Sequence, residues 1–281
     1  MLTKDSVMAL GYFDGVHIGH EQVIKKAVEV AKEKNALSEA ITFSGKPDCI
    51  FDSKERASRM LSVGVKMVRI FNFTDEFKNT PAAEFIDEFT KRYNVRAYVC
   101  GRDFTYGKDK SGNAETLKAF CDEKGLELYV VDEVERNGKK VSASEIKKML
   151  KDGDVRGANA LLTQPYSISG EVIHGNKIGR KIGFPTANVT VPKGNCKLKQ
   201  GVYKGVAVYR RKKYPCIINY GGKPTVGDNE ISLEVYIDKF GKRIYGKILR
   251  VEFCEYLRDI KKFESLDELK KQLTKDKESL K

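Results

Sequence analysis

The sequence has 281 residues, of which 41% are hydrophobic and 32% are charged, and its formal net charge is +13. At about 150 residues per domain, this length predicts two compact domains, and the composition excludes an intrinsically disordered chain. No apolar run reaches about 18 residues and the N-terminus lacks a signal-peptide pattern, so we expect a cytoplasmic protein without a membrane partner.

The first part of the chain, up to about residue 162, alternates short β-branched or aromatic runs with longer helical patterns, as parallel α/β folds do. The expected strands are 7–10, 39–43, 66–73, 96–101 and 126–131. The expected helices between them include 21–34, 81–93 and 114–124, and Pro81 suits a first helical turn. This order predicts a doubly wound, Rossmann-like parallel sheet.

After residues 163–166 the pattern changes, because strands now follow strands with glycine, asparagine and basic turns between them. The expected strands are 168–174, 203–209, 214–219, 231–237 and 248–253, which predict a small antiparallel β-barrel. A C-terminal helix is indicated by the capping pair Ser265 and Glu268 and by the apolar stripe of Leu266, Leu269 and Leu273. We therefore expect an α/β domain over 1–164 and an all-β domain over 165–281.

The most informative segment, GYFDGVHIGH at 11–20, lies between the first strand and the first helix, where the ligand crevice of such folds opens. Its glycines allow close approach of phosphate, and the helix N-terminus offers free N–H groups. His17 and His20 share one face of the first turn and can donate hydrogen bonds to phosphate oxygens that gain charge during displacement. This arrangement indicates nucleotidyl transfer without a covalent intermediate. A metal pair or two capping histidines are the alternatives, although no nearby cysteine completes a zinc shell.

The segment resembles the G-x-F-D-G-V-H-x-G-H motif of the bacterial bifunctional riboflavin kinase and FAD synthetase family. The resemblance implies that His17 and His20 are catalytic and that five residues contact nucleotide: Gly11, Phe13, Asp14, Gly15 and Gly19. A second segment, GRDFTYG at 101–107, is similar to the family's G-x-D-F-x-F-G loop. It implies that Asp103 binds nucleotide and that Phe104 and Tyr106 bind flavin. Without the family resemblance, this segment would be interpreted as an ordinary loop bounded by glycines.

Two motifs depart from the family pattern. The family's T-F-x-P-H-P is TFSGKP at 42–47 here, so a histidine is lost and Lys46 offers positive charge to the nucleotide in its place. The family's S-S-[ST]-x-I-R is SASEIK at 142–147, which keeps Ser142 and Ser144 for the nucleotide but replaces an arginine by Lys147. Losing that bidentate fork is expected to weaken transition-state binding by about 1–3 kcal/mol. The alternative to a bifunctional enzyme is therefore a riboflavin kinase whose N-terminal module is weak or inactive.

The segment GEVIHGNKIGRKIGFPTAN at 170–188 combines glycines with basic residues, as expected for a loop that closes over a polyphosphate. Thr186 and Asn188 offer oxygen ligands for Mg²⁺. The string resembles the riboflavin kinase motif G-x-V-x-H-G-x-x-x-G-R-x-x-G-F-P-T-A-N, and the similarity continues at 201–203, 219–225 and 257–263, so it covers essentially the full chain. It implies nucleotide contacts by six residues: Gly175, Gly179, Arg180, Gly183, Pro185 and Asn219.

By the same resemblance, Glu234 is the general base that accepts the proton of the riboflavin 5′-hydroxyl, and Arg258 lies near the flavin. Without the family, Glu234 is the polar side of an alternating strand, and Arg258 is a surface ion-pair partner of Asp259 or Glu255. His174 either touches phosphate or bonds to backbone. The family's histidine two residues after the base is Tyr236 here.

The resemblance implies two ATP-dependent reactions that use Mg²⁺: phosphorylation of riboflavin to FMN, and adenylylation of FMN to FAD with release of pyrophosphate. The net charge and the barrel also suggest an RNA-binding protein or flavin-responsive regulator, but the aromatic stacking signatures of RNA modules are missing. The six cysteines form no C-x-x-C pair and indicate neither a zinc ribbon nor a disulfide framework. We expect small-molecule substrates, no nucleic acid partner, and a monomer or weak homo-oligomer.

Overall fold

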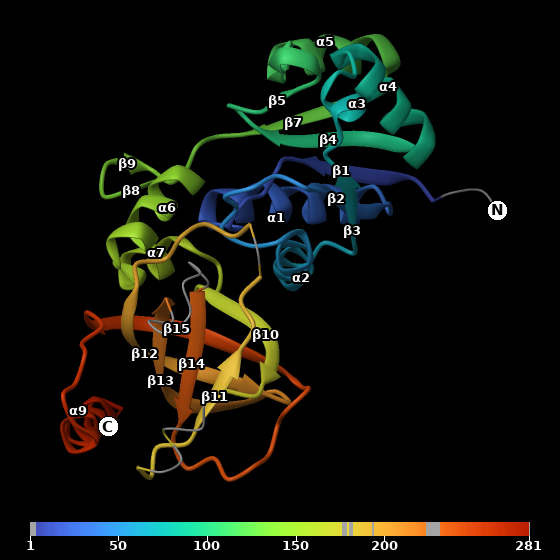
Figure 1. Cartoon of the computed structure of the whole chain (residues 1–281). Helices are drawn as coiled ribbons and strands as arrows, with labels where there is room; N and C mark the ends of the chain where they lie inside the picture. Colours follow the sequence, from blue (N-terminus) through green and yellow to red (C-terminus); the bar gives the residue numbers. More distant parts are fainter. Residues whose placement is uncertain (1–3, 176–178, 180–181, 193, 223–230, 281) are drawn as a thin grey trace. The chain divides into compact units, whose positions relative to one another are not determined.

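The computed structural model describes residues 4–175, 179, 182–192, 194–222 and 231–280 (Figure 1). The chain forms two compact units. The first comprises Met1–Ile146, Leu161–Thr163 and Gly194–Cys196, and the second comprises Lys147–Ala160, Gln164–Lys193 and Lys197–Lys281. Each unit is therefore made of more than one stretch of the chain. The predicted division of the two activities between residues 164 and 165 stays a prediction.

A five-stranded sheet with the order β3-β2-β1-β4-β7 forms the centre of the first unit. All four neighbouring pairs are parallel. The strands are β1 (Ser6–Leu10), β2 (Leu37–Ser44), β3 (Met67–Asn72), β4 (Val95–Gly101) and β7 (Glu127–Val131). The strand order reverses between β1 and β4, and a crevice opens at the carboxyl ends of the strands at such a point. The predicted doubly wound sheet is confirmed.

Helices cover both faces of this sheet (Figure 1). Val7 and Ala9 of β1 pack with α1 and α2 on one face, whereas Met8 and Leu10 pack with α4 and α5 on the other. Because both faces of β1 are buried, its sequence is a continuous run of small or apolar residues. The helices of this unit are α1 (Ile18–Glu33), α2 (Ser53–Val63), α3 (Asp75–Lys78), α4 (Ala82–Tyr93) and α5 (Ala114–Lys124), with the 3-10 turn η1 (Lys108–Lys110).

One helix boundary and one additional helix differ from expectation in ways that affect the site. Helix α1 begins at Ile18, three residues before the expected start at Glu21, because the His17 side chain caps it. Helix α2 was not among the expected helices, because two of its three buried positions hold Arg56 and Arg59 and no apolar stripe reveals it. Two short hairpins complete the unit: β5 (Thr105–Tyr106) with β6 (Gly112–Asn113), and β8 (Glu135–Arg136) with β9 (Lys139–Lys140).

The second unit contains a closed, six-stranded antiparallel barrel with the order β10-β11-β14-β13-β12-β15, which confirms the predicted barrel. Its strands are β10 (Ser167–Ile173), β11 (Thr186–Val189), β12 (Gly201–Tyr209), β13 (Lys212–Gly222), β14 (Ile231–Ile237) and β15 (Ile248–Arg258). Strand β11 was not expected, because its four residues lie within the glycine-rich motif. Helices α6 (Ala143–Asp152) and α7 (Val155–Leu161) precede the barrel in the chain.

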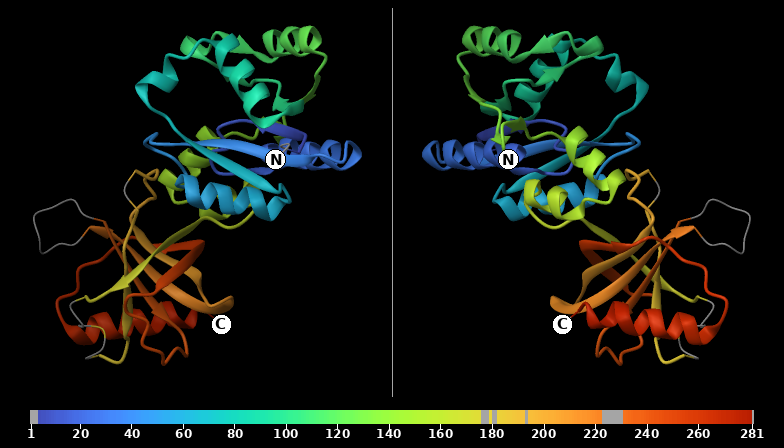
Figure 2. Two further views of the ribbon diagram at one scale, coloured as in Figure 1. Left: turned by 90° about the vertical axis from the view of Figure 1, so that its right-hand side faces the viewer. Right: turned by 90° about the vertical axis from the view of Figure 1, so that its left-hand side faces the viewer.

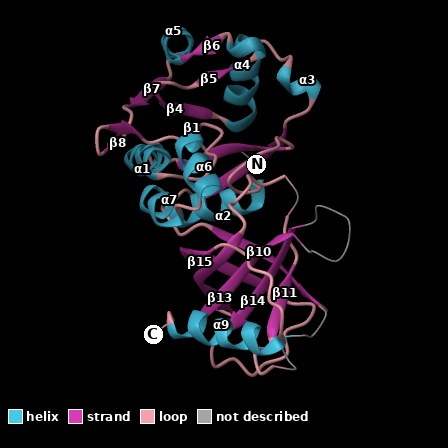
Figure 3. Ribbon diagram, turned by 60° about the vertical axis from the view of Figure 1, so that its left-hand side comes forward, coloured by secondary structure: helices cyan, strands magenta, loops and turns pink. Residues whose placement is uncertain are grey.

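Helix α9 (Leu266–Glu278) ends the described chain and lies beside the barrel strands (Figures 2 and 3). Ser265 caps it by accepting from the Glu268 main-chain N–H at 3.2 Å, as predicted. The predicted leucine stripe is only partly buried, because Leu266 is 55% exposed while Leu269 and Leu273 are half-buried, and the buried residue of the helix is Asp276.

Candidate active sites

The loop after β1 is held in a strained conformation by buried side chains. Phe13 and Val16 have positive φ angles of 55° and 45°, which is unusual for bulky residues and rarer still for a β-branched one. The Asp14 carboxylate accepts from the Ile50 main-chain N–H at 2.8 Å, and the Thr163 hydroxyl donates to the Val16 carbonyl at 2.9 Å. A strained backbone of this kind persists only where surrounding contacts hold it in place, as they do in pre-organised binding loops.

Glycines in this loop are required by close packing. A Cβ at Gly11 would lie 2.9 Å from the Phe13 ring, and one at Gly15 would lie 2.8 Å from Ile50. Gly15 also has a φ of +82°, which favours glycine. The side chains of Phe13 and Asp14 are themselves buried, so they support the loop and leave its backbone to face a ligand.

The side chains of His17 and His20 contact each other at the end of this loop. Their ring centroids are 3.6 Å apart, and the His17 Nδ1 atom accepts from the His20 main-chain N–H at 3.3 Å. Burial lowers the pKa of His17 to about 4. Burial, together with the neighbouring His17 and Arg56, also lowers the pKa of His20. Both imidazoles are therefore neutral near pH 7, and His17 carries its proton on Nε2 because Nδ1 is an acceptor.

The two alternative interpretations of these histidines, helix capping and metal binding, have different outcomes. His17 is indeed the N-cap of α1, so capping and ligand contact use different nitrogens of the same ring. The described residues include no group of three or more His, Cys, Asp or Glu side chains arranged to hold a metal ion. The buried Nδ1 of His20 has no hydrogen-bond partner among the described residues.

The second motif brings charge to the same histidine. Asp103 and Lys140 both act on the pKa of His17, the carboxylate raising it and the ammonium lowering it. Lys140 donates to Asp103 at 2.7 Å and is also bound by Glu133. The rings of Phe104 and Tyr106 stack with centroids 5.5 Å apart, and Tyr106 is buried in the core against Phe85.

Lys46 lies beside the first motif, as its predicted role requires. Its Nζ atom is 4.9 Å from the centre of the Tyr12 ring, so a cation–π contact attaches it to the loop. Arg56 of α2 also contacts that ring, with its Cζ atom 4.4 Å from the centre. The Arg56 guanidinium is buried and donates to the Phe51 carbonyl at 3.3 Å and to the Phe43 carbonyl. Sequence reasoning missed Arg56, since nothing in its local pattern distinguishes it from a solvated helix residue.

Ser142 directly precedes helix α6, and Ser144 lies in its first turn. The Ser142 hydroxyl accepts from the Glu145 main-chain N–H at 3.3 Å. Lys147 follows one turn later on the same helix, where the second unit begins. Their contact with nucleotide stays a prediction.

In the barrel, strand register assembles a polar row from three separate motifs. Asn188 of β11 and Asn219 of β13 both lie opposite Glu234 of β14, one on each side. Thr186 lies opposite Tyr236 in the next row of the same face. Directly opposed residues share one face of a sheet, and these side chains are half-buried, whereas Val235 between them points into the core.

The glycine-rich segment packs closely against this row. A Cβ at Gly175 would lie 2.2 Å from the Asn188 side-chain nitrogen, and one at Gly179 would lie 2.2 Å from the Phe184 carbonyl oxygen. Gly183 has a φ of +84°. Arg180 lies outside the described residues.

A small cavity of about 90 Å³ is lined by Pro185 and Thr186 and also by Val235, which faces the core. Tyr245 also lines it, and the His174 ring stacks on that tyrosine with centroids 4.0 Å apart. Among the residues of the polar row, Thr186 lines this cavity, whereas Glu234, Asn188 and Asn219 do not.

Arg258 is an ion-pair partner, but not of the carboxylates that sequence reasoning named. Its guanidinium pairs with Asp276 of α9, with Nη2 2.6 Å from Oδ2. Its link to Asp259 is a hydrogen bond from Nη1 to the main-chain oxygen at 3.1 Å, and Glu255 pairs with Arg156 instead. The distant partner comes from the packing of α9, which no local pattern reveals.

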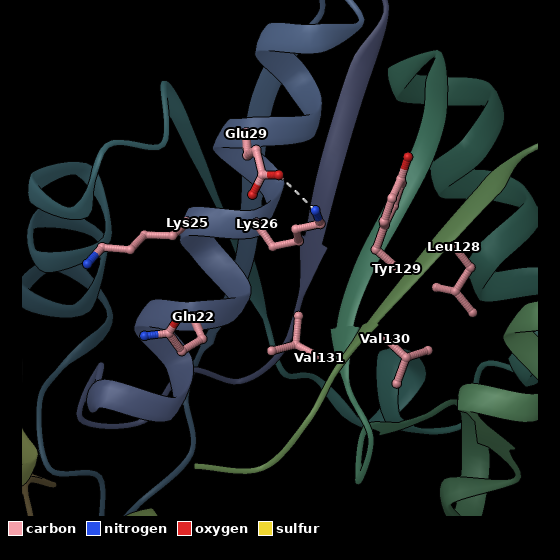
Figure 4. Close-up of a pocket in the computed structure, with 8 residues that line it drawn as sticks. All are labelled: Gln22, Lys25, Lys26, Glu29, Leu128, Tyr129, Val130 and Val131. Atoms are coloured by element: carbon pink, nitrogen blue, oxygen red, sulfur yellow. Dashed lines mark hydrogen bonds and ion pairs between the residues drawn. The ribbon is translucent and has the colours of Figure 1, made fainter.

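A larger cavity of about 410 Å³ lies between α1 and β7 (Figure 4). Its lining includes Lys26, which pairs with Glu29 at 2.9 Å and lies over the Tyr129 ring. None of the predicted site residues lines it, so we assign it no role in the chemistry.

Comparisons with known families agree with the two halves of the fold. The sequence model described as FAD synthetase matches residues 1–145, and the one described as riboflavin kinase matches residues 162–281. The fold and the two glycine-bounded sites thus define a two-part, ATP-dependent transferase of flavin coenzyme synthesis.

Relatives match along nearly the whole chain. Bifunctional riboflavin kinase/FMN adenylyltransferase of Bacillus subtilis is 37% identical and the match covers 97% of this chain and 90% of that protein. The Listeria monocytogenes protein of the same description is 32% identical, covering 98% and 91%. A solved structure described as a macrolide-efflux protein from Streptococcus pneumoniae has a TM-score of 0.89 at 33% identity, covering 99% and 94%. The chain belongs to the bifunctional riboflavin kinase/FMN adenylyltransferase family.

Family membership confirms the predicted resemblance and both predicted activities. The enzyme uses ATP, riboflavin and FMN as substrates. The alternative of a weak or inactive N-terminal module is not favoured, because the FAD synthetase model matches residues 1–145 in spite of the departure at Lys46 and the relatives are described as bifunctional.

Proposed function

We propose that the polar row of the barrel is the riboflavin kinase centre and that Glu234 is its general base. The observation that carries this proposal is the register that puts Asn188 and Asn219 on either side of Glu234. The carboxylate accepts the proton of the riboflavin 5′-hydroxyl as that oxygen attacks the γ-phosphorus of ATP. A base of this kind contributes about 10²- to 10⁴-fold, whereas positioning both substrates is worth about 7–11 kcal/mol.

Phosphate binding in this centre is assigned to the glycine segment that packs closely against the row. Gly175 and Gly179 let the segment approach the row, and Pro185 and Thr186 follow in the same segment. Neutral oxygen donors on one face fit Mg²⁺, so Thr186 and Asn188 would hold the ion, which neutralises charge on the phosphates when bound. The presence of Mg²⁺ is part of this proposal.

For the adenylyltransferase centre, we assign binding of the ATP phosphates to the loop 11–20 and transition-state stabilisation to His17 and His20. Both histidines are neutral near pH 7, so each ring carries one N–H group that can donate a hydrogen bond to a phosphate oxygen. The FMN phosphate oxygen attacks the α-phosphorus of ATP and pyrophosphate leaves. Lys46 adds positive charge from its place over Tyr12, and Asp103, Phe104 and Tyr106 border the flavin and nucleotide.

The remaining expectations also belong to the proposal: a cytoplasmic enzyme, monomeric or weakly oligomeric, without nucleic acid or membrane partners. Among the helices of the described chain, none is long and apolar enough to cross a membrane. We do not extend the efflux description of the pneumococcal structure to this chain, because both family models and the named relatives describe flavin coenzyme enzymes.

One assay with two variants tests the division of labour. The protein is incubated with Mg²⁺, ATP and either riboflavin or FMN, and the flavins are resolved by chromatography. Wild-type protein is expected to form FMN and FAD, Glu234→Gln only FAD from FMN, and His20→Ala only FMN from riboflavin. Loss of both products in either variant would contradict the assignment of the sites.

A further inference from the structure

Helix α9 contacts the barrel through a buried ion pair as well as through half-buried leucines. The side chain of Asp276 is 5% exposed and that of Arg258 is 15% exposed. Leu266 is 55% exposed, but Leu269 and Leu273 are half-buried and share a helix face with Asp276. Burying a carboxylate is costly, and well-packed apolar residues would dock a helix at least as well. Because leucines are already available to dock the helix, the ion pair calls for a further explanation.

The pair has the geometry that fixes an arginine in one plane. Arg258 Nε is 3.1 Å from Asp276 Oδ1 and Nη2 is 2.6 Å from Oδ2, which is a bidentate contact. Gln272, one turn earlier in α9, donates to Asp276 Oδ1 at 2.8 Å and holds the carboxylate itself. Nη1 of Arg258 donates to the Asp259 carbonyl at 3.1 Å. All three nitrogens of the guanidinium are thus held, Nε and Nη2 by Asp276 and Nη1 by the Asp259 carbonyl.

We propose that Asp276 is a positioning residue of the riboflavin kinase reaction, which orients the Arg258 guanidinium toward the flavin and makes α9 part of the riboflavin site. The inference rests on the riboflavin kinase function proposed for the barrel and on the place near the flavin that the family resemblance implies for Arg258. A guanidinium already fixed in its bound orientation loses less rotamer entropy when riboflavin arrives. Without the Asp276 carboxylate, Arg258 is free to rotate and riboflavin binds more weakly, while the phosphates of ATP are unaffected.

The chain offers a matched control for helix docking. Lys204 of β12 donates to the Ser279 carbonyl just after α9, at 2.5 Å, and touches neither Arg258 nor Asp276 among the described contacts. Lys204→Met therefore loosens the attachment of α9 but leaves the bidentate pair in place. KM for ATP and kcat of FMN formation depend on the same barrel and report whether the second unit of each variant is folded.

The test measures KM for riboflavin, KM for ATP and kcat of FMN formation, with circular dichroism of each variant as the folding control. We expect Asp276→Asn to raise KM for riboflavin about tenfold or more, as loss of a charged hydrogen bond does, with KM for ATP unchanged. Lys204→Met should stay within about twofold of wild type. If Asp276→Asn is not folded, Gln272→Met, which only frees the carboxylate, takes its place with a smaller rise in the same constant.

Three outcomes would overturn the inference: an unchanged KM for riboflavin in Asp276→Asn, an equal rise in both KM values, or an equal rise in Lys204→Met. Arg258→Ala separates this failure from that of the proposed flavin site. A raised KM for riboflavin in Arg258→Ala, with none in Asp276→Asn, refutes the positioning role alone. An unchanged KM in Arg258→Ala refutes the flavin contact of Arg258 itself.

Discussion

The main-chain N–H of His20 donates to Nδ1 of His17, and the two rings stack with their centroids 3.6 Å apart. This contact fixes the neutral tautomer of His17, because an accepting Nδ1 leaves the proton on Nε2. A motif read from sequence as two equivalent donors is therefore asymmetric. His17 caps the helix and presents one N–H, while His20 is supported by the edge of the Phe13 ring.

Replacing His20 by alanine should lower FAD formation about 10²- to 10³-fold, the usual effect of removing one transition-state donor. FMN formation from riboflavin should not change, because His20 lies in the first unit. His174→Ala is the matched control, since it removes the histidine of the barrel and should leave FAD formation intact. Steady-state rates of both reactions check this, and parallel losses of FMN and FAD in His20→Ala would contradict it.

The stability of the first unit should fall as the pH drops from 7.5 to 5.0. The pKa of His17 is about 4 in the folded chain, against 6.5 for an ordinary histidine. Between these values the unfolded chain binds a proton that the folded chain does not, so acid favours unfolding. His17 alone accounts for about 2 kcal/mol over this interval, and the lowered pKa of His20 adds to it in the same direction.

His17→Asn isolates this effect, because asparagine is a good N-cap and does not titrate. The free energy of opening of α1, measured by native-state hydrogen exchange at the two pH values, should depend less on pH in the variant by about 2 kcal/mol. The same pH dependence in variant and wild type would show that His17 is not the group responsible.

The parts of the fold that were predicted correctly are those whose sequence carries its own burial pattern. Strand β1 is buried on both faces, so its run of apolar residues is visible without any partner. Helix α2 escaped prediction because Arg56 and Arg59 fill its buried positions, and β11 escaped because it has only four residues inside a glycine-rich motif. Burial of charge and short pairing depend on tertiary contacts, which local patterns do not encode.

The same distinction applies to the sites. His17 and His20 are three residues apart, so helical spacing alone predicts that they meet. The row that joins Asn188 and Asn219 to Glu234 depends on the register of three strands, and only the family resemblance brought these residues together before the structure did. Asp276 carried no signal at all, because its partner Arg258 lies in a strand that sequence patterns do not connect to α9.

Replacing the buried Arg56 by methionine should lower FAD formation at least about tenfold, because the loss of its charge-assisted hydrogen bonds loosens the structure under Tyr12. The carbonyls of Phe43 and Phe51 lose their donor, which costs about 1–3 kcal/mol each. Arg59→Met is the matched control: Arg59 is equally buried in α2 but pairs with Glu55 and lies over Phe51 instead of Tyr12. Urea denaturation and both activity assays compare the two variants. Equal loss of FAD formation in the two variants would show that Arg56 contributes only to the stability of the first unit and has no specific role at Tyr12.

Replacing Glu234 by glutamine should slow FMN formation about 10²- to 10⁴-fold, because the amide keeps the size of the side chain but cannot accept the hydroxyl proton. The neighbours Asn188 and Asn219 stay in register, so ATP should still bind with near wild-type affinity by calorimetry. FAD formation from FMN should be unchanged in the same preparation. Glu255→Gln, which breaks only the ion pair to Arg156 on the barrel, should form FMN at the wild-type rate. Normal FMN formation in Glu234→Gln would mean that the base is another group, whereas lost ATP binding would mean that the carboxylate holds the nucleotide in place rather than taking the proton.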